Sequence, residues 1–241
     1  MNTSPPLKPL LQETFPLWED LEPTCWVFQA VDQQQNDFGG LIECLELGGA
    51  HQGFIARLRA AHPLRAIHNS QHDKRLLDVF TEGAAFAWAL RAAKLGRPRF
   101  VTGEGAPDIA VEDIWIEAKT VRHSQEEEQF EENVLNPHLR RHGMAMRGPA
   151  ALGAPPAGLL RKFQSDLDDA LLKWQRQGRI GQLIVFYGFN IDFGVSGRAA
   201  SQAISAWAAI SERRHGVSIV ICSRFEWDSP IYDNISVIAK A

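Results

Sequence analysis

Apolar residues recur at helical spacing in two long stretches of the chain. The first runs from Asp73 to about residue 95 and ends at Gly96 and Pro98, which stop a helix. The second covers residues 159–177 and keeps its apolar side chains on one face. Both patterns predict amphipathic helices. The stripe of the first helix consists of Leu76, Leu77, Phe80, Ala84, Phe86, Ala87 and Leu90.

Short apolar runs bounded by turn residues predict strands between and after these helices. The Glu112-Asp113 pair separates two of the runs, and residues 183–187 form a continuous apolar run typical of a strand buried on both faces. A further helix over 198–214 precedes the last strand. From residue 73 the predicted order is therefore α-β-β-β-α-β-α-β. The predicted strands cover residues 99–102, 108–111, 114–121, 183–188 and 217–222.

The remaining segments are irregular in pattern. Residues 1–70 contain five prolines before residue 24 and glycines at mixed spacings, which predicts an extended start and an irregular, mostly helical N-terminal extension. Residues 123–143 are polar and acidic and predict a solvated helix, and residues 147–158 predict a loop. The domain organisation we expect is an extension over 1–70 followed by one domain over 71–241.

Composition restricts the functional classes. The 241 residues are 45% apolar and 22% charged, as in an ordinary globular protein, and the net charge is −4. The chain is no polybasic binder, so a polyanion would have to be held by a local patch or by bound metal. Three scattered cysteines favour neither a disulfide framework nor a zinc finger. The N-terminus lacks a signal-peptide pattern and no stretch is long enough to span a membrane, so we expect a cytoplasmic protein.

The chemically informative segment is GEGAPDIAVEDIWIEAKT, residues 103–120. Side chains alternate along a strand, so Trp115, Glu117 and Lys119 share one face, and Ile114, Ile116 and Ala118 share the other, apolar face. Charged groups on so apolar a strand are costly unless they are paired or bind a metal.

A hairpin around residues 112–113 would bring Asp108 close to Glu117. Two carboxylates in hydrated surroundings can hold Mg²⁺, which takes hard oxygen ligands and keeps several waters. The sequence therefore predicts a Mg²⁺ site, which Mn²⁺ can also occupy, between Asp108 and Glu117.

These residues resemble the motif of the PD-(D/E)XK nuclease superfamily. The matching positions are Pro107-Asp108 and Glu117-Ala118-Lys119, and Glu82 lies where many members carry a glutamate on the preceding helix. The resemblance covers about half of the chain. It implies an α/β fold with a restriction-endonuclease-like αβββαβ core, a mixed central sheet and flanking helices, to which the N-terminal extension is added.

The resemblance also implies roles. Asp108, Glu117 and the carbonyl of Ala118 would bind one or two divalent cations, and Glu82 would bind a second cation through water. Lys119 would position the attacking water and stabilise charge near the scissile phosphate. The products would carry 5′-phosphate and 3′-hydroxyl ends.

The implied activity is that of a metal-dependent DNA endonuclease of the restriction, defence or repair type, acting on DNA rather than RNA, with a homodimer among the states allowed. The helix over residues 159–177 lacks the QxxxY continuation of the exonuclease-like subgroup. An RNA-directed nuclease and a non-catalytic nuclease-like binding module remain alternatives.

Plainer interpretations compete with this one. Glu117 and Lys119 could form an ion pair on a solvated strand, and Glu82 could lie on the wet face of its helix. Arg161 and Lys162, which begin the second long helix, could contact phosphates or simply be solvated cations. His138 and His142 have i, i+4 spacing but no HExxH glutamate, so solvated side chains are expected there.

Overall fold

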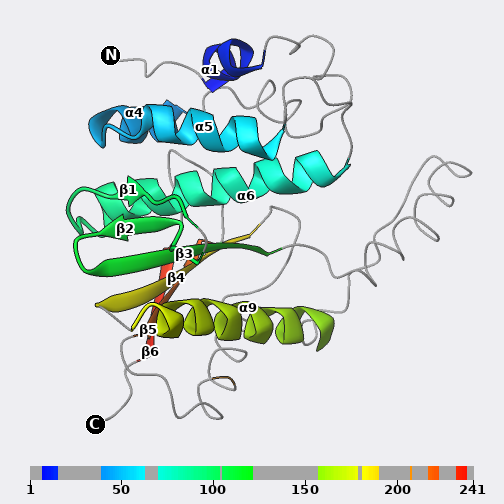
Figure 1. The fold of residues 1–241 in the computed structure, drawn as a ribbon, viewed down its shortest axis with the longest axis vertical. Coiled ribbons are helices and arrows are strands. Elements are labelled where there is room, and N and C mark those ends of the chain that lie inside the picture. The colour runs from blue at the N-terminus through cyan, green and yellow to red at the C-terminus, as the bar shows by residue number, and fades with distance from the viewer. Residues whose placement is uncertain are drawn as a thin grey trace, which may run out of the picture.

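The computed structural model describes residues 7–15, 39–62, 70–103, 105–121, 157–178, 181–189, 207, 217–222 and 232–237. In these residues a six-stranded sheet has the strand order β1-β2-β3-β4-β5-β6 (Figure 1). The three central strands are parallel, and the pairs β1–β2, β2–β3 and β5–β6 are antiparallel. The strands are β1 (Arg99–Phe100), β2 (Ile109–Val111), β3 (Ile114–Val121), β4 (Gln182–Phe189), β5 (Val217–Cys222) and β6 (Tyr232–Val237).

Helices cover both faces of the sheet. Helix α6 (Ser70–Ala87) lies on one face and continues into a π-helical turn, η1 (Trp88–Ala92), while α9 (Ala157–Arg176) lies on the opposite face (Figure 1). The N-terminal helices form an outer layer over α6. They are α1 (Leu7–Thr14), α4 (Gly39–Leu47) and α5 (His51–Ala61).

The two faces of β4 contribute to two separate apolar cores. Ile184 and Phe186 pack in the core shared by α6 and the N-terminal helices, and Leu183, Val185 and Tyr187 pack in the core under α9. All five side chains are buried. This confirms the prediction of a strand covered on both faces, and it fixes β3 and β4 in the interior of a mixed α/β sheet.

The β2–β3 hairpin is fixed at its turn by the residue that precedes β4. Glu112 has a left-handed φ of 51°, and the amide of Gln182 donates to the carbonyl of Asp113 at 3.1 Å. Gly181 has a φ of 76°, and a Cβ there would lie 1.5 Å from that same carbonyl oxygen. Only glycine fits this approach. The hairpin is therefore held against the start of β4, which sets where Asp108 and Glu117 lie.

Most predicted elements after residue 73 are present, with differences at their ends. The helix expected over 73–95 begins at residue 70 and turns π-helical at Trp88, and Asp108 lies just before β2 rather than inside it. Strand β6 was not predicted. The predicted helix over 198–214, apart from Trp207, the acidic segment 123–143 and residues 147–156 of the predicted loop lie outside the described residues. The loop prediction is wrong at its end, because α9 already begins at Ala157.

The N-terminal extension is helical in the parts that are described, and α1, α4 and α5 contribute buried residues to the same core as α6. The border near residue 70 stays a prediction. None of the described helices combines the length and the apolar character needed to cross a membrane.

Candidate functional site

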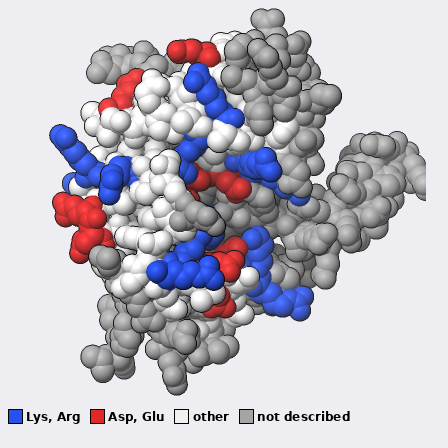
Figure 2. All heavy atoms as spheres, viewed as in Figure 1, with Lys and Arg blue, Asp and Glu red and all other residues white. Residues whose placement is uncertain are grey.

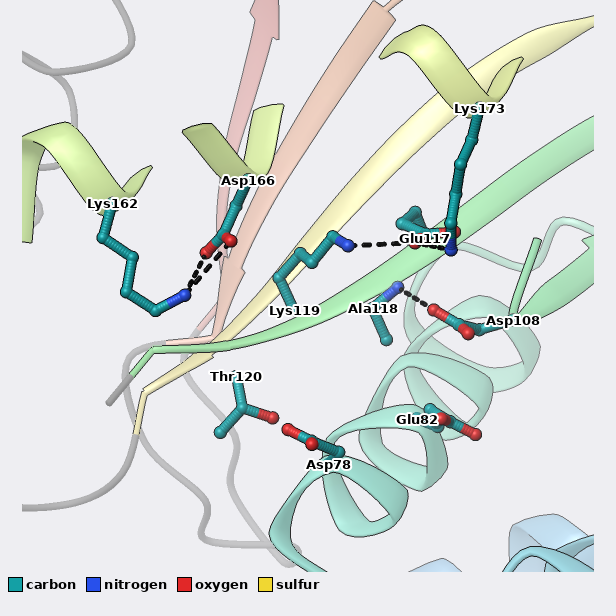
Figure 3. A pocket seen from close by; sticks show the side chains of 10 residues that line it. All are labelled: Asp78, Glu82, Asp108, Glu117, Ala118, Lys119, Thr120, Lys162, Asp166 and Lys173. Carbon is teal, nitrogen blue, oxygen red and sulfur yellow. Dashed lines mark hydrogen bonds and ion pairs between the residues drawn. The ribbon is translucent and has the colours of Figure 1, made fainter. Parts of the chain in front are cut away.

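A cavity of about 380 Å³ lies where the β2–β3 hairpin meets α6 and α9 (Figure 3). On this face of the molecule, acidic side chains occupy the centre, with lysine and arginine side chains on both sides of them (Figure 2). Five carboxylates and three ammonium groups line the cavity. The lining residues are Asp78, Glu82, Asp108, Glu117, Ala118, Lys119, Thr120, Lys162, Asp166 and Lys173.

Asp108 is anchored to the backbone of β3. Ile109 pairs with Ile116, so Asp108, one residue earlier, lies beside the part of β3 that follows Ile116. The Oδ2 atom of Asp108 accepts a hydrogen bond from the amide of Ala118 at 2.8 Å. Burial and the nearby Glu117 carboxylate raise the pKa of Asp108 to about 6, although the Ala118 amide and the lysines act in the opposite direction. Asp108 is therefore a carboxylate that a bound cation would favour in its ionised form.

One carboxylate oxygen of Glu117 forms ion pairs with two lysine ammonium groups. Its Oε1 lies 3.0 Å from Nζ of Lys119 and 2.6 Å from Nζ of Lys173, and its side chain is only 4% exposed. Burial lowers the pKa of Lys119, but Glu117, Asp108 and Asp166 offset this effect and raise it above its ordinary value. Lys119 therefore stays protonated beside the two motif carboxylates.

Glu82 faces the cavity from α6 and is paired with Arg57 of α5. Nη1 of the guanidinium lies 2.5 Å from Glu82 Oε2, and the Glu82 side chain is 14% exposed. Burial and the charges of Asp108 and Asp78 raise the pKa of Glu82 to about 8, against the opposing effect of Arg57. Glu82 is thus not on the wet face of its helix.

Arg57 also holds the backbone from which Asp108 projects. Its Nη2 donates to the carbonyls of Val101 at 2.5 Å and Asp108 at 3.1 Å, and its guanidinium lies 5.0 Å from the centre of the Phe100 ring. A residue of the N-terminal layer therefore connects two cavity carboxylates, one through its side chain and one through its backbone.

The structure brings all the predicted site residues to one cavity. Asp108, Glu117 and Lys119 come from the hairpin and Glu82 from α6 (Figure 3). Glu117 and Lys119 do form an ion pair, but the burial of Glu117 does not fit a solvated strand. Lys162 lines the cavity and pairs with Asp166 at 2.9 Å, whereas Arg161 is exposed.

Sequence reasoning missed Lys173 and Arg57. A signal for Lys173 exists: Lys162, Asp166 and Lys173 recur at i, i+4 and i+11, which aligns them along one side of a helix. Each comes one position before a buried residue, so this polar side borders the core. The buried residues are Phe163, Leu167 and Trp174. For Arg57 we find no comparable signal, since its contacts join segments 25 to 51 residues away.

The donors that line the cavity are mainly oxygen atoms, which suit cations such as Mg²⁺ and Mn²⁺. In the part of the chain that the structure describes, no three His, Cys, Asp or Glu side chains are arranged to hold a metal. Two carboxylates next to a backbone carbonyl match the partial protein shell that Mg²⁺ accepts, because this ion keeps several waters. Asp108 and Glu117 are two such carboxylates in the cavity, and the carbonyl of Ala118 is the further ligand that the resemblance implies.

Comparison of the chain with protein-family models, with curated proteins and with solved structures gives no match. The resemblance to the PD-(D/E)XK nucleases therefore depends on the residues of this chain and on their arrangement.

Proposed function

We propose that the protein is a Mg²⁺-dependent nuclease with a restriction-endonuclease-like core. The observation that carries the proposal is the meeting of Asp108, Glu117, Lys119 and Glu82 in one cavity. If the Pro-Asp and Glu-x-Lys pattern were accidental, its charged side chains would not be expected to line one cavity. Nor would a helix glutamate 26 residues before the aspartate be expected to line the same cavity. Raised pKa values at two of the carboxylates are typical of functional clusters.

The order of elements supports the same proposal. Along the chain the described core runs α6, β1, β2, β3, α9 and β4, which corresponds to the αβββαβ order of the superfamily. Asp108 directly precedes the second of these strands, and Glu117 and Lys119 lie on the third. The sheet is mixed, and helices cover both of its faces.

Asp108, Glu117 and the carbonyl of Ala118 would hold the cation, with Glu82 contributing through water. A bound Mg²⁺ would supply charge stabilisation at the phosphate and a water that ionises more readily. The chain itself supplies the Lys119 ammonium, which is positioned by Glu117 to stabilise the negative charge that develops on a phosphate oxygen. The Ala118 amide fixes Asp108, so the carboxylate is oriented before a substrate arrives.

Nucleic acid, and DNA rather than RNA, is the substrate class that we propose. The five carboxylates of the cavity would repel a polyanion unless their charge is neutralised. The three lysines neutralise part of this charge, and a bound divalent cation would neutralise the remainder. The absence of the QxxxY signature from α9 favours an endonuclease. The alternative is a binding module in which the same charges are structural.

Cleavage of supercoiled plasmid DNA with Mg²⁺, compared with the same reaction in EDTA, tests the proposal. Linear DNA and single-stranded RNA run in parallel to separate endonuclease, exonuclease and ribonuclease activity. We expect nicking that requires metal and that is lost in Asp108→Asn and Glu117→Gln. Asp169→Asn and Glu46→Gln are matched controls, because both residues are exposed and outside the cavity. If the wild type cleaves no nucleic acid with Mg²⁺ or Mn²⁺, the binding-module alternative replaces the nuclease proposal.

A further inference from the structure

Lys173 lies outside the motif and yet forms the shorter of the two ion pairs of Glu117. It reaches from α9 across the cavity to the Oε1 that Lys119 also contacts (Figure 3). One carboxylate therefore faces two ammonium groups. A cation that binds Glu117 has to share this oxygen with them or displace one of them, since like charges so close together repel.

Lys173 is the ammonium that can leave. It has a flexible four-carbon stem and is 39% exposed, whereas Lys119 is 20% exposed and projects from the same strand as Glu117. Asp108 and Asp166 also lie near Lys119, and they would stabilise its positive charge even when Glu117 binds a metal cation. Displacing Lys173 requires only rotation of a half-exposed side chain.

The place to which Lys173 would move is defined by the charge distribution in the cavity. Asp78, Glu82 and Asp108 lie on the α6 side, and the three lysines lie on the α9 side together with Glu117 and Asp166 (Figure 3). Lys162 is already engaged by both oxygens of Asp166, at 2.9 and 3.1 Å. An anionic group that enters next to α9 would therefore meet the ammonium that Glu117 has released.

We propose that Lys173 substitutes for the divalent cation at Glu117 in the metal-free protein and contacts a substrate phosphate once metal is bound. The inference rests on the proposed nuclease function and adds to it a residue that switches partner. It predicts opposite effects of one substitution, because removing Lys173 removes a competitor of the metal and a contact of the nucleic acid. A purely structural ion pair would not produce this combination.

The test uses the full chain and begins with Mn²⁺ alone. Calorimetric titration compares the wild type with Lys173→Met, Lys173→Arg and Arg176→Met, the last a control at an exposed cation of the same helix. We expect Lys173→Met to bind Mn²⁺ about three- to tenfold more tightly, in line with the strength of a partly exposed ion pair. Arg176→Met should match the wild type, and Lys173→Arg, which keeps a positive charge opposite Glu117, should bind Mn²⁺ less tightly than Lys173→Met. Circular dichroism establishes that each variant is folded.

Steady-state cleavage of plasmid DNA in saturating Mg²⁺ measures the second effect. For Lys173→Met we expect KM to rise about tenfold with little change in kcat, and the salt dependence of log kcat/KM to fall by about one, the signature of one lost phosphate contact. If the wild type binds Mn²⁺ but Lys173→Met binds it no more tightly, or if KM and the salt slope are unchanged, the inference is overturned while the nuclease proposal stands. If the wild type binds no Mn²⁺, the proposed metal site itself fails.

Discussion

Replacing Glu82 with glutamine tests how much the buried negative charge of this side chain destabilises the folded protein. The carboxyl is buried next to Asp108 and Asp78, and its pKa is raised to about 8 from an ordinary value of 4.5. A raised pKa means that the folded protein binds the proton more tightly than the unfolded chain does. The corresponding stability is fully present below pH 4.5 and is lost as the pH rises through 8. Glutamine keeps the shape of the protonated form and cannot ionise.

The size of the effect follows from the two pKa values. At about 1.4 kcal/mol per pH unit, the wild type loses about 5 kcal/mol of stability between pH 4.5 and pH values above 8, and about 3 kcal/mol of this is lost by pH 7, where only the unfolded chain is ionised at this position. Glu82→Gln should therefore unfold at the same urea concentration as the wild type near pH 4.5 and be more stable at pH 7, and more so at pH 9. These differences are upper bounds, since water entering the cavity would reduce them.

The assay is urea unfolding in EDTA between pH 4.5 and 9, followed by tryptophan fluorescence. Glu46→Gln, at an exposed glutamate, should show no pH-dependent difference from the wild type. Adding Mg²⁺ at pH 8 should stabilise the wild type more than Glu82→Gln. A Glu82→Gln variant that is equally or less stable than the wild type at pH 9 would refute the reasoning, because Arg57 would then have compensated the buried charge in full.

Other substitutions test the remaining parts of the site. Lys119→Ala should reduce kcat for plasmid cleavage by about 10²–10³-fold and leave calorimetric Mn²⁺ binding largely intact, because an ammonium is no metal ligand; unchanged turnover would exclude it from the active site. Asp108→Asn should lose Mn²⁺ affinity in the same titration yet gain stability to urea in EDTA at pH 7, because its raised pKa of about 6 marks an ionised form that the fold disfavours; a loss of stability would contradict this. Gly181→Ala should lower the thermal midpoint by several degrees, since its Cβ would overlap the Asp113 carbonyl, and an unchanged midpoint would show that the turn can move away.

Sequence patterns predicted the parts of the fold that depend on local periodicity. The stripe of α6 is visible because its burial repeats at the helical period, and the apolar run of β4 is visible because the strand is buried on both faces. The Glu112-Asp113 turn and the alternation along β3 then placed Glu117 and Lys119 on one face, and the structure has them there. Strand β6 escaped prediction because its sequence, YDNISV, carries polar residues at a sheet edge and lacks a clear alternation.

The contacts of the site were harder to predict, since they join segments distant in sequence. Nothing near Arg57 indicates that it will meet Glu82 and the carbonyl of Asp108, and nothing near Lys173 alone indicates Glu117. Such pairings follow from the tertiary arrangement of α5, α6 and α9 rather than from propensity. That the motif residues would lie close together could be predicted because the resemblance to a known family supplied the expected partners, while their roles stay a prediction.

The sequence separation of these contacts also has a consequence for the order of folding. Arg57 meets the Asp108 carbonyl across 51 residues, and Lys173 meets Glu117 across 56. Each contact closes a long loop, which costs chain entropy before it contributes any stabilisation. The hairpin of β2 and β3 can form early, as its strands are adjacent in the chain, but the cavity around it is complete only after both helical layers have docked. Partly folded chains should therefore already hold Asp108 near Glu117 and Lys119 while lacking Arg57 and Lys173.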